Sequence, residues 1–156
     1  MKLKIKVKLF GDQVLPEIID KGDFIDLRSV MDYTFKPGEY MLLNLGVGMI
    51  LPEGFEAIVV PRSSTYRNYG IMCANSFGVI DNTYSGDNDQ WKFPAFSPNG
   101  GRVNNGDRIC QFRIQLSQKA TFWQKLKWLF SSGIEIVQVE HLNTINREGI
   151  GSTGKR

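Results

Sequence analysis

Histidine, cysteine and long apolar runs are all scarce in this chain of 156 residues. A Ser-His-Asp or Cys-His catalytic site would need the only histidine, His141, whose neighbours VEHLN are typical of a strand end. The two cysteines, Cys73 and Cys110, have apolar, strand-like neighbours and no CxxC spacing. This pattern predicts buried, unreactive thiols. A histidine- or cysteine-based active site is therefore disfavoured.

The chain also lacks a membrane span and a strong charge bias. No segment approaches the roughly 20 apolar residues that cross a bilayer, and no unbroken apolar stretch indicates a secretory signal. We therefore expect a cytoplasmic protein without a membrane partner. The net charge is only +3, and Lys2, Lys4, Lys6 and Lys8 contribute four of the positive charges. A charge this small and this local gives no reason to expect a nucleic-acid partner.

What the chain does contain is a series of short strand-like runs. The four lysines alternate with apolar residues, as in a half-buried strand with a solvated basic face. Similar runs recur between turn signals such as KPGEY and SPNGGR. They cover residues 2–10, 40–51, 55–61, 70–80, 108–116 and 134–140. Because no linker or repeat interrupts them, we expect one all-β domain over 1–156, built as a barrel or a sandwich.

The segment 121–131, TFWQKLKWLFS, is the exception. Phe122, Leu126, Leu129 and Phe130 recur at the spacing of one helix face, which predicts a short amphipathic helix. This apolar face can pack over the β domain or at a subunit seam, or it can dock another protein. A membrane-surface role is only weakly supported, because few cations accompany the apolar residues.

The glycine-rich tail, GIGSTGKR, literally matches the GxxxxGK of a phosphate-binding loop. That loop requires a following helix, and here the chain stops after Arg156. A tail of this composition can still wrap an anion with backbone N–H groups, or it can be a disordered end. Its polar residues are Arg147, Ser152, Thr153, Lys155 and Arg156.

Three further segments carry candidate chemistry. In PRSSTYRNYG (61–70), Ser63 or Ser64 can cap a helix, and Arg62 beside a helix N-terminus can hold a phosphate. In GDRICQFRI (106–114), Gln111 interrupts an apolar strand and can face either solvent or a pocket. In GVIDNTYSGD (78–87), Asp81 and Tyr84 flank a turn at Asn82 and Thr83, which is ordinary hairpin chemistry or a small pocket.

Taken in order, these segments resemble the five motifs of the trimeric dUTPase family. The blocks PRSST, GDNDQWKFPA and GDRICQFRI are similar to those of its Gram-positive and phage branch. The five segments are GDFIDLRS (22–29), PRSSTYRNYGI (61–71), NSFGVIDNTYSGD (75–87), GDRICQF (106–112) and NREGIGSTG (146–154).

The resemblance implies a homotrimer of jelly-roll-like β-barrels with active sites between subunits. It implies Mg²⁺-assisted water attack on the α-phosphate of dUTP, giving dUMP and pyrophosphate, which keeps uracil out of DNA. The related dCTP deaminases are an alternative, but they need a glutamate ten residues beyond Asp81, where this chain has Trp91. A binding protein that docks on a regulatory partner is a second alternative, as a role added to catalysis.

The resemblance also assigns roles to the hairpin residues. Asp81 is the general base that orients the attacking water and holds the 3′-hydroxyl. Tyr84 packs beneath the deoxyribose and excludes a ribose, and Asn75 helps to position the base. The backbone that meets the uracil edge belongs to Gly78, Val79 and Ile80.

Phosphate binding is implied for residues of three other motifs. Asp26 is expected to reach a water of the magnesium ion, which is held mainly by the three phosphates. Residues 146–156 are expected to form a flexible lid that closes over the triphosphate. The phosphate-binding residues are Arg62, Ser63, Ser64, Gln111, Arg147, Ser152 and Thr153.

The chain departs from the family pattern in two places. Ile150 stands where the family tail has a phenylalanine that stacks on uracil, so we expect Phe93, or else Trp91, to supply the ring. The segment 117–133 is an insertion relative to the compact family pattern, and it is the expected site for any regulatory protein partner.

Overall fold

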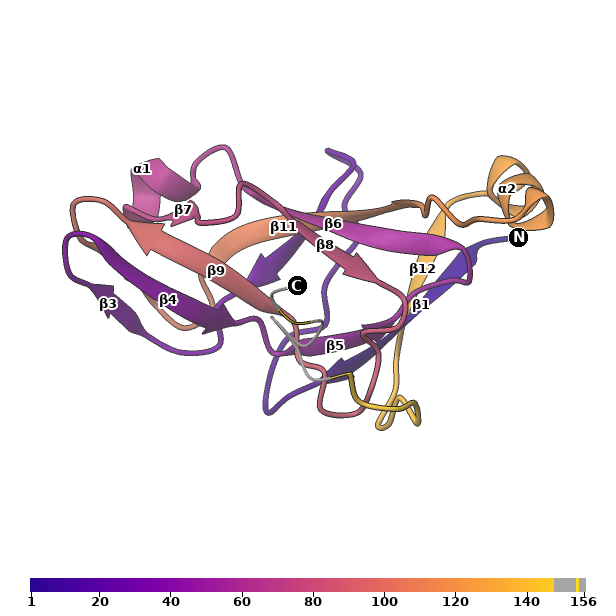
Figure 1. Cartoon of the computed structure of the whole chain (residues 1–156), viewed down its shortest axis with the longest axis horizontal. Helices are drawn as coiled ribbons and strands as arrows, with labels where there is room; N and C mark the ends of the chain where they lie inside the picture. The colour runs from indigo at the N-terminus through magenta and orange to yellow at the C-terminus, as the bar shows by residue number, and fades with distance from the viewer. Residues whose placement is uncertain (148–153, 155–156) are drawn as a thin grey trace.

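The computed structural model describes residues 1–147 and residue 154 and is built mostly of β-strands, as the sequence predicts (Figure 1). Its two helices are α1 (Thr65–Tyr69) and α2 (Phe122–Leu129). The strands are β1 (Leu3–Leu9), β2 (Ile25–Arg28), β3 (Tyr33–Phe35), β4 (Glu39–Asn44), β5 (Val47–Ile50), β6 (Phe55–Pro61), β7 (Met72–Cys73), β8 (Gly78–Asp81), β9 (Lys92–Ser97), β10 (Gly101–Val103), β11 (Arg108–Leu116) and β12 (Ile134–Gln138).

The strands form four small sheets that pack into one jelly-roll-like body. The sheet that matters most for the site has the order β2-β11-β6-β8, with every pair antiparallel. The others have the orders β4-β9-β7, β12-β1-β5 and β10-β3. Strands β1 and β12 run parallel, although they lie at opposite ends of the sequence.

The core follows the predicted alternation of side chains. On β1, Leu3, Ile5 and Val7 are buried while Lys4 and Lys6 are exposed, so the basic face of this strand is solvated as expected. The largest fully buried side chains come from several sheets and include Phe55, Trp91, Phe93 and Phe112.

Several strand boundaries differ from the sequence prediction. The run 40–51 is two strands, because the chain turns at Gly46, whose φ of 67° suits glycine. The run 70–80 is likewise divided by a bend at Ser76. Four strands were not predicted, namely β2, β3, β9 and β10. Three of them span only three or four residues, too few for a period of two to register, and β9 is buried on both faces.

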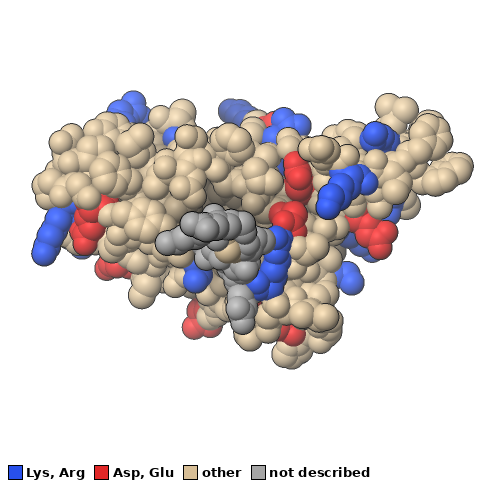
Figure 2. All heavy atoms as spheres, in the orientation of Figure 1, with Lys and Arg blue, Asp and Glu red and all other residues tan. Residues whose placement is uncertain are grey.

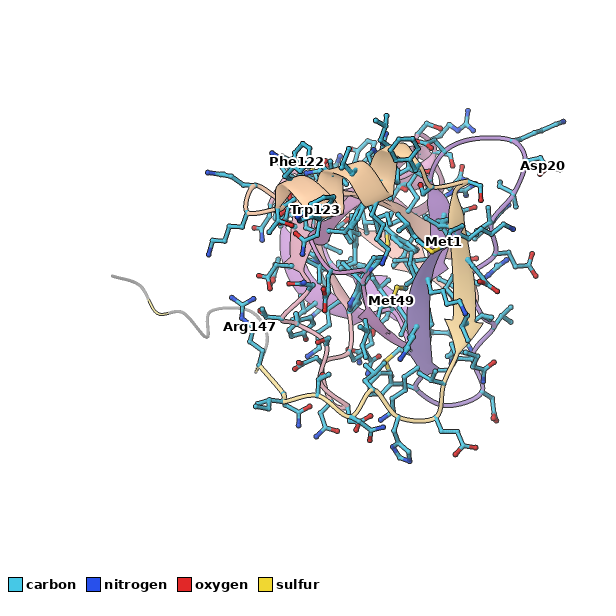
Figure 3. The ribbon with its side chains drawn as sticks, turned by 90° about the vertical axis from the view of Figure 1, so that its right-hand side faces the viewer. Met1, Asp20, Met49, Phe122, Trp123 and Arg147 are labelled. Atoms are coloured by element: carbon cyan, nitrogen blue, oxygen red, sulfur yellow. The ribbon has the colours of Figure 1, made fainter. Side chains whose placement is uncertain are left out.

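The predicted helix exists as α2, where Thr121 and Gln124 form a capping box. Of the expected alternatives, packing of the Phe122 face over the β domain of the same chain does not occur in this structure. Trp128 is the residue that meets the domain, with its ring 5.4 Å from that of Phe55, whereas Phe122 is 66% exposed. Helix α2 lies at one end of the long axis, beside the N-terminus (Figures 1 and 3).

The cysteine prediction is confirmed. Cys73 and Cys110 are free and buried. Burial raises the pKa of both thiols, and that of Cys110 lies well above its ordinary value. Among residues 1–147 and 154, no helix is long and apolar enough to cross a bilayer.

Candidate functional site

Asp81 ends strand β8 at the predicted hairpin turn. The backbone N–H of Tyr84 donates to the Asp81 carbonyl at 3.2 Å, which places Asn82 and Thr83 at the two central positions of the turn. The Asp81 carboxylate accepts hydrogen bonds at Oδ1 from the backbone N–H and the hydroxyl of Thr83, the former at 2.9 Å. These bonds hold the carboxylate at the tip of the hairpin.

The second oxygen of Asp81 pairs with Arg147. The guanidinium contacts Oδ2 and also donates to the Thr83 hydroxyl oxygen at 2.7 Å. Burial raises the pKa of Asp81, but the hydrogen bonds from Thr83 and the charge of Arg147 outweigh it, so the pKa lies below its ordinary value. The Asp81 side chain is still 45% exposed. It is therefore an ionised carboxylate that water can reach.

Tyr84 follows Asp81 across the turn and has its own fixed position. Its hydroxyl donates to the Gln90 carbonyl at 2.9 Å, and its ring packs against the core. Burial and the nearby Asp89 raise the pKa of the phenol, so it stays protonated and remains a donor. The hydrogen bond to Gln90 and the core contacts together hold the Tyr84 ring in place.

Strand β8 lies at an edge of its sheet. It pairs with β6 on one side, and among the described strands it has no partner on the other. Alternate N–H and C=O groups along that side of Gly78, Val79 and Ile80 are thus available to a ligand. Asn75 is exposed just before the strand, and its carbonyl accepts from the Phe77 N–H at 2.7 Å.

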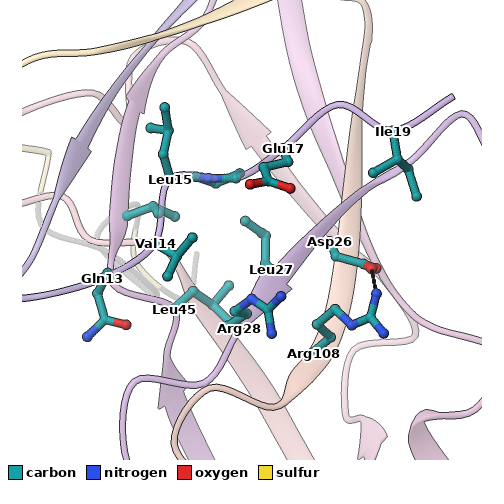
Figure 4. Close-up of a pocket in the computed structure, with 12 residues that line it drawn as sticks. Gln13, Val14, Leu15, Glu17, Ile19, Asp26, Leu27, Arg28, Leu45 and Arg108 are labelled. Carbon is teal, nitrogen blue, oxygen red and sulfur yellow. Dashed lines mark hydrogen bonds and ion pairs between the residues drawn. The ribbon is translucent and has the colours of Figure 1, made fainter.

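Three predicted residues, Asp26, Arg62 and Gln111, lie toward the opposite edge of the same sheet, together with Arg108, which was not predicted. Asp26 Oδ1 pairs with Arg62 Nε at 2.7 Å, and Oδ2 pairs with Arg108 at 3.1 Å. Gln111 lies directly opposite Asp26 on β11, and its amide donates to the Pro61 carbonyl at 3.4 Å. Asp26 and Arg108 also line a pocket with residues of the 13–19 loop (Figure 4). We call Asp26, Arg62, Arg108 and Gln111 the arginine cluster.

The serines of the second motif flank helix α1. Ser64 occupies the N-cap position as predicted, but its side chain makes no capping hydrogen bond. The hydroxyl of Thr65 accepts from the Arg62 N–H and donates to the Ile109 carbonyl instead, both at 2.8 Å. Ser63 is exposed. The two serine hydroxyls are therefore not committed to the helix cap.

The structure does not bring the arginine cluster and the hairpin together within one chain. On the shared neighbour strand β6, Asp81 is opposite Glu56 and Gln111 is opposite Val60. Four residues of strand separate these levels by about 13 Å, and β8 and β11 lie on opposite sides of β6. One nucleotide bound at Asp81 of a single chain would not meet the arginine cluster of that chain.

The expectation that Phe93 or Trp91 supplies a stacking ring is wrong for this structure. Both side chains are 0% exposed and belong to the core, so neither offers a ring face to a ligand. Phe77, which the sequence reasoning missed, is 51% exposed and directly precedes β8. Phe77 could have been identified from the sequence as an aromatic residue directly next to a predicted hairpin strand.

Two predicted phosphate-binding residues, Ser152 and Thr153, lie outside the described residues. His141 is exposed and lies 60 residues along the chain from Asp81, and its Nδ1 is 3.8 Å from the Asp87 carboxylate. Within the described part of the chain, no group of three or more histidine, cysteine or acidic residues is arranged to hold a metal. Because both oxygens of Asp26 pair with arginines, the protein groups alone do not form a magnesium site.

Comparison with known proteins points to one family. A family model described as dUTPase matches residues 24–127. The SPbeta prophage-derived deoxyuridine 5'-triphosphate nucleotidohydrolase YosS of Bacillus subtilis is 43% identical over 155 residues, covering 99% of this chain and all of the relative. The deoxyuridine 5'-triphosphate nucleotidohydrolase of Trichodesmium erythraeum is 42% identical over 157 residues, covering 99% of each.

Solved structures share the fold. The dUTPase of Streptococcus mutans has a TM-score of 0.64 at 22% identity, covering 71% of this chain and 94% of that one. A dUTPase of phage phi11 of S. aureus, described as coordinating a structural Mg(II) ion, has a TM-score of 0.66 at 17% identity, covering 76% and 94%. The dUTPase of Staphylococcus bacteriophage 80alpha, described with the statement that phage dUTPases control transfer of virulence genes, scores 0.66 at 17%, covering 76% and 93%.

Proposed function

The chain belongs to the dUTPase family, and from this premise we propose that it hydrolyses dUTP to dUMP and pyrophosphate by water attack on the α-phosphate. The supporting observation is Asp81, an accessible carboxylate that Thr83 and Arg147 keep ionised at the tip of a hairpin. Such a group can orient a water molecule and accept its proton. Hydrolysis of dUTP keeps uracil out of DNA and supplies dUMP. We expect the protein to act in the cytoplasm.

The nucleoside is recognised by the hairpin. The free backbone edge of β8 forms hydrogen bonds with the uracil edge, and Asn75 positions the base. A pocket that is closed at the fifth carbon of the base excludes the thymine methyl group. Tyr84 lies beneath the sugar, where its fixed ring would collide with a 2′-hydroxyl. Asp81 also holds the 3′-hydroxyl. Discrimination by a clash of this kind needs a ring that cannot move aside, which is what the bond to Gln90 provides.

Phe77 is the residue that we propose for stacking on uracil, in place of the buried Phe93. Its ring is exposed and adjoins the strand whose edge meets the base. Stacking on a base is insensitive to the identity of that base, so Phe77 contributes to affinity while the backbone of β8 contributes specificity.

The phosphates are held by Arg62, Ser63, Ser64 and Gln111, with Arg147 on the γ-phosphate and Ser152 and Thr153 from the tail. Because Asp26 pairs with Arg62 at 2.7 Å, it orients that guanidinium and leaves other N–H donors for the phosphates. Magnesium would be held mainly by oxygens of the triphosphate and by waters, and Asp26 would be the residue that reaches one of those waters. The ion would supply positive charge that offsets the charge of the phosphates.

A homotrimer completes the site. The hairpin and the arginine cluster of one chain are too far apart to hold one nucleotide, so the cluster of a neighbouring copy is needed at each hairpin. A ring of three copies satisfies every hairpin and every cluster at once.

A substrate panel tests the activity. Pyrophosphate release is measured with dUTP, dTTP, dCTP and UTP, and only dUTP is expected to turn over rapidly. Ammonia release from dCTP would instead support the deaminase alternative. That reaction is disfavoured because Trp91, at the position of the required glutamate, is a fully buried indole that cannot shuttle protons.

A second role, docking of a regulatory protein through 117–133, is favoured by the exposure of α2. Phe122, Trp123, Leu129 and Phe130 are each at least 66% exposed, which is unusual for side chains of this size. No acidic residue occurs between Asp107 and Glu135, whereas Lys119, Lys125 and Lys127 accompany the aromatic residues. Figure 2 shows this end of the molecule as mostly uncharged, with basic side chains beside it. The partner is therefore expected to present an acidic, apolar segment.

This role is tested with the double variant Trp123→Glu and Phe130→Glu. An acidic, leucine-rich peptide is expected to bind the unmodified protein in a salt-sensitive manner and not the variant, while both proteins sediment as trimers with equal dUTP turnover. Dissociation of the variant to monomers would place α2 at the subunit seam. Binding to anionic vesicles but not to the peptide would also contradict the proposal.

A further inference from the structure

A series of hydrogen bonds joins the segment that follows the hairpin to the segment that precedes the tail. We call residues 85–89 the docking strip and residues 142–147 the C-terminal segment. The Leu142 N–H donates to Asp87 Oδ1 at 2.8 Å. The Thr144 hydroxyl donates to the Ser85 carbonyl. The Asn88 N–H donates to the Asn146 side chain at 2.8 Å, and the Arg147 N–H donates to Asp89 Oδ2 at 2.9 Å.

Asp89 is the most buried member of this ladder that carries a charge. Its side chain is 2% exposed, and its carboxylate accepts the Gly86 N–H at 2.8 Å as well as the Arg147 N–H. A buried carboxylate is tolerated only when hydrogen bonds replace its hydration. The Gly86 N–H alone does not replace the hydration of Asp89, because the other of its two N–H donors is Arg147, which is 58 positions away in the sequence.

The close approach of the C-terminal segment to Gly86 is independent evidence that the docking strip accommodates this segment. A Cβ atom added at Gly86 would lie 2.4 Å from the Asn146 Cα and 2.7 Å from the Asn146 N. No side chain fits in that space, so only glycine lets the C-terminal segment lie this close. Its φ is not positive, so the requirement is one of space rather than of backbone conformation.

We propose that Asp89 is a positioning residue that fixes the backbone of Arg147 so that its guanidinium lies at Asp81. Arg147 is bound at both ends, by Asp89 at its N–H and by Asp81 and Thr83 at its guanidinium. In Figure 3 the labelled side chain of Arg147 lies at the edge of the molecule. With its backbone fixed, Arg147 needs only to turn its side chain away from Asp81 to engage the γ-phosphate, so it loses less conformational freedom on binding.

This inference rests on the proposed function for the role of Arg147 at the phosphate, but the positioning itself is testable without activity. Trypsin cleaves after arginine, so cleavage after Arg147 reports how firmly its backbone is held. Asp89→Asn retains the size of the side chain but removes the charge that both N–H groups contact. It is expected to accelerate cleavage after Arg147 at least tenfold, as followed by mass spectrometry.

The kinetic test is a double-mutant cycle. Asp89→Asn is expected to lower kcat/KM for dUTP about tenfold, mainly through KM, because one charge-assisted contact is lost. In an Arg147→Ala background the same change is expected to have almost no further effect, since Asp89 acts through Arg147. Ser97→Ala removes the hydroxyl of a buried serine that donates to the Gly70 carbonyl, on strand β9 and away from residues 85–89. It is the matched control and should change neither readout.

Gly86→Ala provides a second route if Asp89→Asn does not fold. It displaces the C-terminal segment while leaving Asp89 in place, and it should reproduce the faster cleavage and the higher KM. Unchanged cleavage in both variants, or additive effects of Asp89→Asn and Arg147→Ala, would overturn the proposal. If the unmodified protein does not hydrolyse dUTP, the proposed function fails, and the cleavage experiment still decides the positioning of Arg147.

Discussion

Two carboxylates of one sheet, Asp81 and Asp26, are both paired with arginine but in different ways. Asp26 is held by two arginines from neighbouring segments of the sheet, and its side chain is 18% exposed. Asp81 is 45% exposed, and its single arginine comes from near the end of the chain. The first arrangement orients cations, and the second leaves an oxygen that water can reach. We therefore propose that the same residue type serves as an anchor at one side of the sheet and as a base at the other.

The largest effect is expected from removing the base. Asp81→Asn keeps the shape of the side chain, and its oxygen can still accept from the Thr83 N–H, but it can no longer take a proton. We expect kcat to fall by about 10³-fold, with little change in the affinity for a non-hydrolysable dUTP analogue measured by calorimetry. A kcat within tenfold of the unmodified enzyme would mean that another group activates the water.

Removing the anchor should act differently. Asp26→Asn leaves Arg62 and Arg108 without a counter-charge, so we expect the free energy of unfolding to fall by about 2 kcal/mol. KM should rise because Arg62 loses its orientation, while kcat changes less than in Asp81→Asn. Denaturant unfolding and steady-state kinetics measure both. Asp23→Asn is the control, because the Asp23–Arg113 pair is at the surface and contributes little.

The proposed stacking of Phe77 on the base predicts a moderate effect. Phe77→Ala should raise KM for dUTP about tenfold by removing one stacked ring, with kcat nearly unchanged. Tyr40→Ala removes a similarly exposed aromatic side chain from β4 and should leave KM as it was. Equal KM values for the two variants would exclude stacking by Phe77.

The smallest predicted effect concerns the charge state of Asp81. Arg147→Ala removes a cation that lowers the pKa of this carboxyl, so the pKa should rise, as followed by carbon NMR of the carboxyl group. A lowered folded-state pKa stabilises the protein above the unfolded-state value, and this contribution is lost as the pH falls through the folded-state value. The variant should therefore lose stability at neutral pH, and the difference should vanish in strong acid. An unchanged pKa would show that Arg147 does not pair with Asp81 in solution.

Sequence patterns predicted some elements because those elements carry their information locally. The alternation on β1 and the helical spacing of α2 each depend on fewer than a dozen neighbouring residues. Which face of α2 contacts the domain could not be predicted. The contact made by Trp128, rather than Phe122, depends on the position of Phe55, which is distant in the sequence. Likewise, the letters WKFPAF do not reveal that β9 is covered on both sides and that Phe93 is buried.

The site shows the same division between local and distant information. Asp81, Tyr84 and their turn could be predicted, because the hairpin is continuous in sequence. The contact of Asp89 with Arg147 could not, since it joins residues 58 positions apart that share no pattern. The pairing of Asp26 with Arg62 and Arg108 was missed for the same reason, and it changes Asp26 from a free acid to an anchored one.

The most direct test of a site shared between copies is to mix two inactive variants. Asp81→Asn lacks the proposed base, and Arg62→Ala lacks the proposed phosphate-binding arginine of the cluster. If each site combines the hairpin of one copy with the arginine cluster of another, mixed trimers should regain dUTP hydrolysis at about a quarter of the sites, as random assembly of a closed ring requires. Pyrophosphate release no higher than that of either variant alone, from trimers shown to have exchanged subunits, would contradict a site shared between copies.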